Sequence, residues 1–421
     1  MSRFKEPVYL VAGLRTPFGR GGCALAHHDA LTLSVPLVQA MAEQVQGGRP
    51  DVVLWGSVIP NLGWSNLARE VWIDAGLDPR VPAYSVTLAC STSMTAAFSA
   101  AGMIGPGVDI ALVGGAETMS RGPIGLKVET QDHIRELFAK SPADALSAFN
   151  KLTAADFNLP TKGWTNRVTG LTMGEHMEIT AKEWKITREA QDEWAYESHK
   201  RAVAGWENGF FSDLVIKLPE LEKDSNPRGD STPEKLASLK PAFDKSGSGT
   251  LTAGNSSPIT DGAAGLWVAS AAGLKRLNAG PAVELVDYEV AAVEWKSDGL
   301  LMAPPVAIAR LLDRHGLKYE DVALWEIHEA FTAQVLANIA GLEDPKWIEE
   351  RTGVTRDFGR FPRERVNPNG GSVAIGHPFG ATGARDLSQA VKELAALPRG
   401  SKAIVSVCAD GGHGTVALLQ N

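Results

Sequence analysis

The stretch Val81–Gly102, which reads VPAYSVTLACSTSMTAAFSAAG, decides how the rest of the chain is interpreted. The alternation of Tyr84, Val86 and Leu88 predicts a strand, and the small residues after Cys90 predict a tightly packed helix. A thiol at a helix N-terminus meets free backbone N–H groups and the positive end of the helix dipole, and both favour the thiolate. The stretch therefore predicts a buried nucleophile, although a lone cysteine also serves as a small apolar core residue.

Size and composition are those of an ordinary globular protein. The chain has 421 residues, enough for two or three domains, and it is 44% hydrophobic and 21% charged. The formal net charge of −8 argues against a protein that coats nucleic acid and against a general attraction to anionic membranes. We therefore expect no nucleic-acid partner, and an anionic ligand would need a local basic site.

Cysteine usage and the first residues bear on location. Cys23, Cys90 and Cys408 are far apart and match neither a disulfide framework nor a zinc pattern. The start, MSRFKEPVYLVAG, lacks the apolar core of a signal peptide, and no run of about 18 apolar residues occurs. We expect a cytoplasmic protein without an integral membrane segment.

Strand and helix patterns alternate in the first part of the chain. Buried strands are predicted over Val8–Ala12, Asp51–Val58 and Val108–Gly115, and helices over Leu31–Val45 and Ser65–Ala75. The third strand is expected to end in a turn at GGAETMS. This alternation predicts βαβ units and a largely parallel sheet with both faces covered.

The character of the chain changes between residues 122 and 249, where glycine, proline, charged and aromatic residues become more frequent. A helix is predicted over Thr187–Gly209, with Thr187 as its N-cap and a glycine at its end. The segment His133–Leu152, broken at Ser141 and Pro142, predicts two short amphipathic helices. These helices either cap the inserted region or form a docking surface for a partner or a membrane.

The C-terminal half repeats patterns of the N-terminal half. Asp51–Trp55 (DVVLW) is matched by Asp321–Trp325 (DVALW), and Val108–Gly115 is matched by Lys402–Cys408. A duplicated βαβ-rich domain is therefore predicted, with a strand-like segment at 282–291 opening the second copy. The predicted division is 1–121 for the first part of the N-terminal domain, 122–249 for an inserted loop domain, 250–281 for the completion of the N-terminal domain, and 282–421 for the C-terminal domain.

Three further sites carry residues suited to chemistry. His328 follows the predicted strand Leu324–Ile327, where α/β proteins place their sites. His377 lies among five glycines in NPNGGSVAIGHPFGATGAR, and Cys408 opens the glycine-rich CADGGHG. Each residue alone is equally compatible with a structural role. Together with Cys90 they give two thiols and two imidazoles, which suits acyl transfer by a nucleophile, a base and donors aimed at a carbonyl oxygen.

These motifs resemble those of the thiolase family. GHPFGATGAR at Gly376–Arg385 resembles the family's histidine signature, HEAF at His328–Phe331 its oxyanion-site motif, and CADGGHG at Cys408–Gly414 its C-terminal cysteine signature. RTPFG at Arg15–Gly19 and TAGNSSPITDGAA at Thr252–Ala264 also match. The resemblance covers essentially the whole chain, and the motifs occur in the family's order.

The resemblance implies a fold and an activity. The fold would be the α/β thiolase fold, a duplicated βαβαβαββ core in five layers (α-β-α-β-α) with a loop domain inserted in the first half. The activity would be that of an acyltransferase, cleaving a 3-ketoacyl-CoA with CoA into acetyl-CoA and a shortened acyl-CoA, or the reverse condensation. CoA would be a substrate, no cofactor would be bound, and the spacing of histidines and carboxylates shows no metal site.

Roles for the reacting groups follow from the same resemblance. Cys90 resembles the acylated nucleophile, and His377 resembles the base that takes its proton. Cys408 resembles the acid/base at the α-carbon of acetyl-CoA, and His328 would join His377 in stabilising the enolate oxygen. Backbone N–H groups of Cys90 and Asp410 would form the oxyanion hole of the acyl-enzyme step.

The resemblance also implies contacts with CoA. Ser257 resembles the pantetheine contact and Arg228 the contact at the nucleotide end, although a solvated loop arginine is the competing interpretation of Arg228. The tunnel walls would be Met173, Phe243, Ala330 and Phe331.

Some residues depart from the commoner family pattern. His328 in HEAF, where many thiolases have asparagine, points to the branch with the thiolase subunits of fatty-acid oxidation complexes. That branch implies a hydratase/dehydrogenase partner subunit, and the family implies a homodimer or tetramer. Thr92 and Ser93 replace the usual Ser-Gly, so the helix start is expected to differ. Asp410 replaces glycine or alanine, and its carboxylate is expected to point away from the oxyanion.

The hypothesis that accounts for these observations is that the chain is a degradative 3-ketoacyl-CoA thiolase of fatty-acid β-oxidation. A biosynthetic, acetoacetyl-CoA-forming thiolase would use the same residues and differ in tunnel shape. A decarboxylating ketosynthase shares the nucleophilic cysteine, but Cys408 argues against it. A CoA- or lipid-binding relative without activity is the non-enzymatic alternative, which Ser93 and Asp410 favour.

Overall fold

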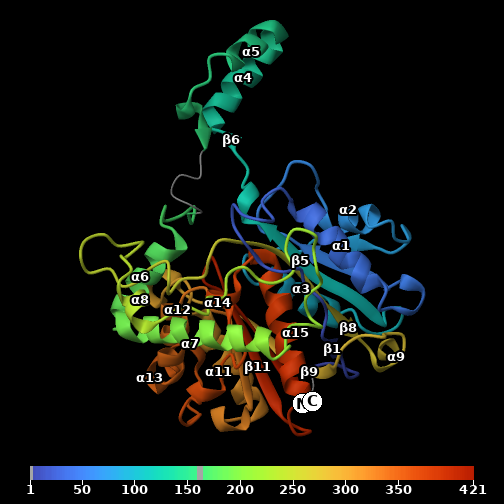
Figure 1. Ribbon diagram of the computed structural model, residues 1–421, viewed down its shortest axis with the longest axis vertical. Helices are drawn as coiled ribbons and strands as arrows, with labels where there is room; N and C mark the ends of the chain where they lie inside the picture. Colours follow the sequence, from blue (N-terminus) through green and yellow to red (C-terminus); the bar gives the residue numbers. More distant parts are fainter. Residues whose placement is uncertain (1–2, 159–164) are drawn as a thin grey trace.

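The computed structural model describes residues 3–158 and 165–421, and a mixed ten-stranded sheet runs through it (Figure 1). Its order is β10-β11-β12-β9-β1-β8-β5-β3-β4, with β2 beside β8. The strands are β1 (Tyr9–Val11), β2 (Gly19–Arg20), β3 (Val52–Gly56), β4 (Ala83–Tyr84), β5 (Ile110–Thr118), β8 (Thr260–Ala269), β9 (Ala282–Ala292), β10 (Leu324–Ile327), β11 (Lys402–Ala409) and β12 (His413–Gln420).

The sheet confirms the predicted duplication. In the first half, β3 pairs parallel with β5, and β8 pairs antiparallel with β5 and β1. In the second half, β10 pairs parallel with β11, and β12 pairs antiparallel with β11 and β9. The halves join where β1 pairs with β9, with Tyr9 opposite Glu284. The expectation of a largely parallel sheet is wrong, because each half closes with antiparallel neighbours.

Helices cover the sheet in layers, in agreement with the predicted fold class. α3 (Thr92–Ala101) and α15 (Thr382–Ala395) pack against each other in the middle, and α15 contacts strands of both halves. α1 (Ala30–Ala42) and α2 (Leu67–Asp74) contact strands of the first half, and α11 (Ala303–His315), beside α12 (Thr332–Leu342), contacts those of the second. Because both faces are covered, every residue of β5 is buried.

Two local predictions around the first strands are wrong. The predicted strand through Leu88 ends at Tyr84. The chain turns at residues 88–92, where Leu88 N donates to Thr92 Oγ1 and the Thr92 hydroxyl donates to Ala89 O. The predicted turn at GGAETMS is β-strand as far as Thr118. Its glycines serve close packing, since a Cβ at position 115 would lie 2.3 Å from Gly380 O.

An arm projects from the body of the molecule in the inserted region (Figure 1). It consists of α4 (Val128–Lys140) and α5 (Pro142–Phe149), with β6 (Gly125–Leu126) and β7 (Phe157–Asn158) paired at its base. The prediction of two short helices broken at Ser141 and Pro142 is confirmed, and Ser141 caps α5 through its hydroxyl.

Most of the other helices pack on or beside the second half. α7 begins after the predicted N-cap Thr187, whose hydroxyl accepts from Ala190 N, and it is followed by Gly209 with a φ of 81°. These helices are α6 (Met173–Glu183), α7 (Arg188–Glu207), α8 (Pro233–Ala237), α10 (Trp295–Asp298), α13 (Pro345–Thr352) and α14 (Ser372–Ile375), whereas α9 (Ala271–Leu274) contacts β8 of the first half. The domain boundaries at 121, 249 and 281 stay a prediction.

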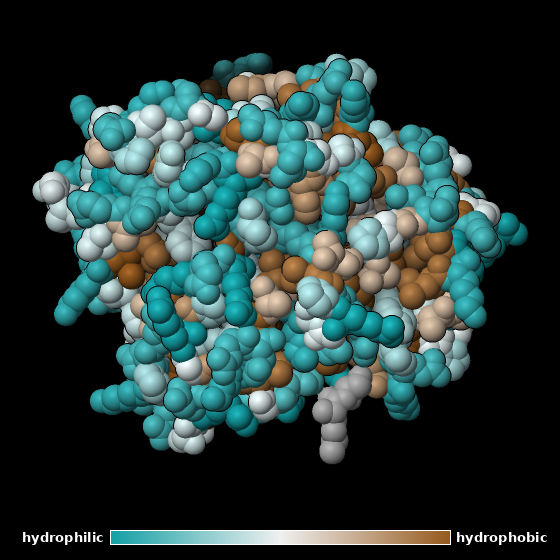
Figure 2. Space-filling view, turned by 60° about the horizontal axis from the view of Figure 1, so that its bottom comes forward, coloured by the Kyte–Doolittle hydropathy of each residue, from teal (hydrophilic) through white to brown (hydrophobic). Residues whose placement is uncertain are grey.

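One face of the molecule is mostly hydrophilic (Figure 2). Figure 2 shows a face on which hydrophobic residues form small patches between polar side chains. In residues 3–158 and 165–421, no helix combines the length and the apolar composition that crossing a bilayer requires.

Candidate active site

The duplicated architecture brings Cys90 and His377 together. Cys90 lies directly before α3 and follows Ala89, which has the unusual φ of 42°. His377 lies between α14 and α15, before a short 3-10 turn at Phe379–Ala381. Because α3 and α15 pack side by side, the two loops meet, and His377 Nε2 lies 3.1 Å from Cys90 Sγ.

Hydrogen bonds set the proton positions of His377. Its Nδ1 lies 2.7 Å from Thr382 Oγ1, and that hydroxyl donates to Pro378 O at 3.0 Å. Since the carbonyl can only accept, the single hydroxyl proton is used there, and Thr382 accepts from Nδ1–H. His377 Nε2 is then unprotonated and faces the thiol of Cys90, as a general base must.

Backbone N–H groups favour the thiolate of Cys90, as predicted, but burial outweighs them and favours the thiol in the resting site. Burial and, to a smaller extent, the charge of Asp410 raise the pKa of Cys90 to about 12. Backbone N–H groups of Cys90 and Asp410 act on the sulfur in the opposite direction but do not outweigh burial. Burial and the Arg385 charge lower the pKa of His377 to about 3, so the pair rests uncharged.

His328 lies beside this pair. Its ring centroid is 4.2 Å from that of His377, and its Nδ1 lies 2.9 Å from Ser372 Oγ. Its Nε2 is buried and has no hydrogen-bond partner among residues 3–158 and 165–421. Burial, then His377 and Arg385, hold the pKa of His328 well below its usual value. A neutral imidazole with one free nitrogen therefore faces the site.

Cys408 and Asp410 lie at the end of β11. Cys408 is buried, and burial together with the nearby Cys90 raises its pKa well above the ordinary value. The Asp410 carboxylate accepts from Asn166 Nδ2 at 2.9 Å and from Gly411 N at 2.7 Å. Asn166 and Gly411 thus hold the carboxylate, and its charge contributes to the raised pKa of Cys90.

The departures at Thr92 and Ser93 have structural explanations. Thr92 forms the turn before α3 through its hydroxyl, as described above. Ser93 Oγ accepts from Ala384 N at 2.8 Å, which ties α3 to α15. Both side chains therefore support the geometry of the Cys90 and His377 loops.

Most residues predicted to contact CoA gather on one side of the site. Met173, Phe243, Ala330 and Phe331 belong to one hydrophobic cluster, and the rings of Phe243 and Phe331 meet edge to face at 5.8 Å. Ser257 joins them through its N–H, which donates to Ala330 O at 3.0 Å. Their roles toward CoA stay predictions.

Arg228 is not part of this cluster. Its side chain is exposed and lines a hollow along α7, together with Tyr196 and Lys200, and its backbone N–H donates to His199 Nδ1 at 3.3 Å. The predicted contact with the nucleotide end of CoA stays a prediction.

Two groups of described side chains bring three metal-ligand atoms within 4.8 Å of one another. One group consists of Cys90, His328 and His377, in which the raised pKa of Cys90 favours the protonated thiol. The other is His27, His28 and Glu220 at the surface.

Sequence reasoning missed several groups that organise the site. Thr382 and Ser372 bond the two histidines, and Arg385 bonds Ser372. Glu329 of the HEAF motif accepts from Ser198 Oγ at 2.7 Å. The only sequence signal for these residues is their place inside the quoted motifs.

Comparisons with known proteins show the family of the chain. The family model for the thiolase N-terminal domain matches residues 8–272, and that for the thiolase C-terminal domain matches residues 279–421. The chain belongs to the thiolase family. Thiolases are acyltransferases, so this thiolase chain is an acyltransferase enzyme.

Relatives of full length have the same architecture. The chain is 35% identical to a 3-ketoacyl-CoA thiolase of Photobacterium profundum, covering 100% of this chain and 98% of that protein, and 36% identical to one of Vibrio cholerae with the same coverage. Two solved thiolase-fold structures also match. The Bacillus anthracis acetyl-CoA acetyltransferase has a TM-score of 0.81 at 33% identity, covering 99% of this chain and 98% of that one. The Acat5 thiolase from Ascaris suum in complex with coenzyme A has a TM-score of 0.80 at 28% identity, covering 99% and 100%.

Proposed function

We propose that this thiolase is a 3-ketoacyl-CoA thiolase that cleaves 3-ketoacyl-CoA in the degradation of fatty acids. The observation that carries the proposal is the contact of Cys90 Sγ with the unprotonated Nε2 of His377 at 3.1 Å. The relatives named 3-ketoacyl-CoA thiolase, which match over their full length, support this substrate.

In the first half-reaction, Cys90 attacks the 3-keto carbon while its proton moves to His377 Nε2. The new oxyanion accepts hydrogen bonds from the backbone N–H groups of Cys90 and Asp410. The bond between C2 and C3 then breaks, and its electron pair forms the enolate of acetyl-CoA. The enolate oxygen accepts from His328 and from the newly protonated His377, and Cys408 delivers a proton to the α-carbon.

The second half-reaction releases the shortened product. The thiol of free CoA gives its proton to the Cys408 thiolate and attacks the acyl carbon on Cys90, and the same backbone N–H groups stabilise the oxyanion. When the tetrahedral intermediate collapses, Cys90 leaves as thiolate and recovers its proton from His377. CoA is thus a substrate that enters beside the Met173, Phe243, Ala330 and Phe331 cluster, and the enzyme needs no bound cofactor.

Assembly and location belong to the same proposal. We place the enzyme in the cytosol, where a reducing medium keeps Cys90 as a free thiol. We expect a homodimer or tetramer, and a hydratase/dehydrogenase subunit that docks on the α4–α5 arm. Support comes from the exposed apolar side chains on that arm, Val128, Phe138, Leu146 and Phe149.

The test is thiolysis of 3-ketoacyl-CoA substrates of increasing chain length, starting from acetoacetyl-CoA, with free CoA. Rates that rise with chain length, together with no turnover by the Cys90→Ser variant, are the expected result. Activity confined to acetoacetyl-CoA would favour the biosynthetic alternative. Activity on no substrate would favour the CoA- or lipid-binding alternative, and full thiolysis by Cys90→Ser would remove Cys90 from the mechanism.

A further inference from the structure

A chain of buried hydrogen bonds ends at the imidazole of His328. Arg385 Nη2 donates to Ser372 Oγ at 2.6 Å, and Ser372 Oγ lies 2.9 Å from His328 Nδ1. We propose that Ser372, held by Arg385, fixes His328 as the tautomer protonated on Nε2, so that this N–H donates to the enolate oxygen. Ser372 and Arg385 are then positioning residues, and their role at the enolate step rests on the proposed function.

The direction of each bond follows from what each group can donate. A guanidinium has no acceptor, so Ser372 Oγ accepts from Arg385. The hydroxyl retains one proton, and within residues 3–158 and 165–421 its only acceptor at hydrogen-bond distance is His328 Nδ1. Nδ1 therefore accepts, and the single proton of the neutral imidazole is on Nε2.

The free Nε2–H is aimed into the reacting site. It has no partner in the described part of the chain, although His328 is completely buried. Ring nitrogens of His328 and His377 and the sulfur of Cys90 all lie within 4.8 Å of one another. An unpaired buried donor at this place is available to an oxyanion that forms only during the reaction.

The two imidazoles therefore have opposite tautomers, each set by one hydroxyl. The Thr382 hydroxyl donates to Pro378 O and accepts from His377 Nδ1, which leaves His377 Nε2 free to take a proton. The Ser372 hydroxyl donates to His328 Nδ1, which leaves His328 Nε2 a donor. One histidine is ready as the base and the other as the electrophilic donor before substrate arrives.

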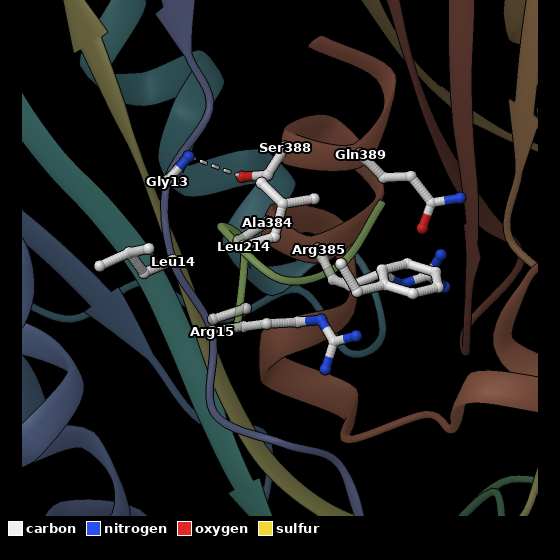
Figure 3. Close-up of a pocket in the computed structure, with 10 residues that line it drawn as sticks. Gly13, Leu14, Arg15, Leu214, Ala384, Arg385, Ser388 and Gln389 are labelled. Atoms are coloured by element: carbon white, nitrogen blue, oxygen red, sulfur yellow. Dashed lines mark hydrogen bonds between the residues drawn. The ribbon is translucent and has the colours of Figure 1, made fainter. Parts of the chain in front are cut away.

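Arg385 adds an electrostatic effect. It projects from α15 beside a small cavity (Figure 3), and its Nη1 lies 2.6 Å from Asp386 Oδ1. Burial is the main reason that the pKa values of His328 and His377 are lowered, and the positive charge of Arg385 lowers both further. Arg385 thus orients Ser372. Its charge also disfavours protonation of the two resting imidazoles, and an imidazolium, with protons on both nitrogens, would have no distinct tautomers.

The inference separates two partial reactions of acetyl-CoA. Exchange of labelled CoA into acetyl-CoA requires only transfer of the acetyl group to and from Cys90. Exchange of the α-protons with solvent requires the enolate. When Cys90 becomes acetylated, the departing CoA takes the Cys408 proton. A second acetyl-CoA then binds, and the Cys408 thiolate removes one of its α-protons. The electron pair moves onto the thioester oxygen, which accepts from His328 Nε2–H.

The experiment compares Ser372→Ala and Ser372→Thr with the wild-type enzyme. Deuterium incorporation into acetyl-CoA in D₂O and exchange of labelled CoA are measured on the same preparations. Ser388→Ala is the matched control, because Ser388 is a buried serine of α15 whose hydroxyl accepts from Gly13 N at 3.2 Å (Figure 3). Removing it costs a hydrogen bond without a contact to His328.

We expect Ser372→Ala to slow deuterium incorporation about tenfold or more while CoA exchange changes less than about twofold. Ser372→Thr, which keeps the hydroxyl, restores incorporation, and Ser388→Ala changes neither rate. Equal losses in both exchanges for Ser372→Ala would show a merely structural role and overturn the proposal.

A tautomer measurement is independent of activity. The method is ¹⁵N-histidine NMR, in which the His328 signals are assigned as those missing from the His328→Gln spectrum. We expect His328 to be protonated on Nε2 in the wild type and to be a mixture of tautomers in Ser372→Ala. A wild-type signal from protonated Nδ1 overturns the inference. If the wild type proves inactive on every CoA thioester, the proposed function fails while this spectrum still decides the tautomer.

Discussion

At the scale of single residues, Cys90 and His377 rest as a neutral thiol and a neutral imidazole rather than as a thiolate–imidazolium pair. The pKa of Cys90 is raised to about 12 and that of His377 lowered to about 3, so the uncharged forms are strongly favoured at neutral pH. The proton therefore leaves the sulfur only as the sulfur attacks, when the charge passes to an oxyanion with two backbone donors. The thiol remains protected from oxidants and alkylating agents until substrate binds.

This state predicts how alkylation of Cys90 depends on pH. Below its pKa a thiol gains about tenfold in thiolate fraction per pH unit, so carbamidomethylation by iodoacetamide is expected to accelerate about tenfold per unit from pH 7 to 9.5 without a plateau. Mass spectrometry of the Cys90 peptide measures the rate, with Cys23→Ser removing the exposed competing thiol. A rate independent of pH in this range would instead establish a thiolate–imidazolium pair.

Sequence patterns predict the positions of the proposed reacting residues better than they predict the protonation states of these residues. Cys90, His377 and Cys408 stand at predicted element ends, and the structure brings the first two into contact. The helix terminus, a local feature, does not reveal that the net pKa of Cys90 is raised, because burial and the Asp410 charge arise from tertiary structure. The role of Ser372 was missed because a hydroxyl proton's direction depends on neighbours distant in the chain.

At the scale of elements, the contact of α3 with α15 holds Cys90 and His377, the proposed nucleophile and base, in position relative to each other. A Cβ at Gly383 would lie 2.6 Å from both the backbone N and the Cβ of Met94, so the helices touch through the glycine. The Ser93 Oγ hydrogen bond to Ala384 N lies at the same crossing. Any increase in the separation of the two helices is transmitted to the loops that carry Cys90 and His377.

We therefore predict that Gly383→Ala impairs both stability and catalysis. The added methyl group forces the helices apart, which is expected to cost about 1–3 kcal/mol in the free energy of unfolding. A displacement of His377 from Cys90 by an ångström is expected to lower kcat about 100-fold. Urea denaturation and thiolysis measure the two effects. Gly102→Ala at the other end of α3, where a Cβ meets nothing closer than 3.5 Å, is the control, and equal behaviour of the variants would refute this account.

The element-scale predictions failed where neighbours decide the conformation. The helix after Thr187 and the two helices of the arm were predictable, because caps, proline and periodicity are local signals. The turn predicted at GGAETMS is strand because Gly115 packs under Gly380, a residue far away in the sequence. The prediction of mostly parallel pairing is wrong because the patterns identify strands but do not show which neighbour each strand pairs with.

At the scale of the whole molecule, the site exists only where the two copies of the duplicated unit meet. One copy provides Cys90 ahead of α3, and the other provides His328, His377 and Cys408. The equivalent positions of α3 and α15 explain why Cys90 and His377 face each other across a pseudo-symmetric centre. The α4–α5 arm is separate from this centre, because its helices pack on each other and make no packing of comparable extent with another described element.

The α4–α5 arm is expected to be dispensable for thiolysis and for stability. Leu126 and Phe157 face each other in the antiparallel pair at its base, so residues 127–156 can be replaced by the two-residue turn Asn-Gly. The shortened enzyme is expected to retain thiolysis within about twofold, and its melting temperature is expected to change by less than about 2 °C, because no core contact is lost. Calorimetry and thiolysis assays measure both quantities, and a loss of either would show that the arm supports the core.

The same variant tests the arm as the docking surface for a hydratase/dehydrogenase subunit. Phe138 and Leu146 are 50% and 62% exposed on the arm, and covering such side chains is a source of binding free energy. Co-expression with that subunit, followed by affinity purification, is expected to recover it with the full chain and not with the shortened one. Phe138→Ser with Leu146→Ser should reproduce the loss without a deletion, since it removes only apolar area. Undiminished recovery with both variants would place the partner elsewhere on the surface.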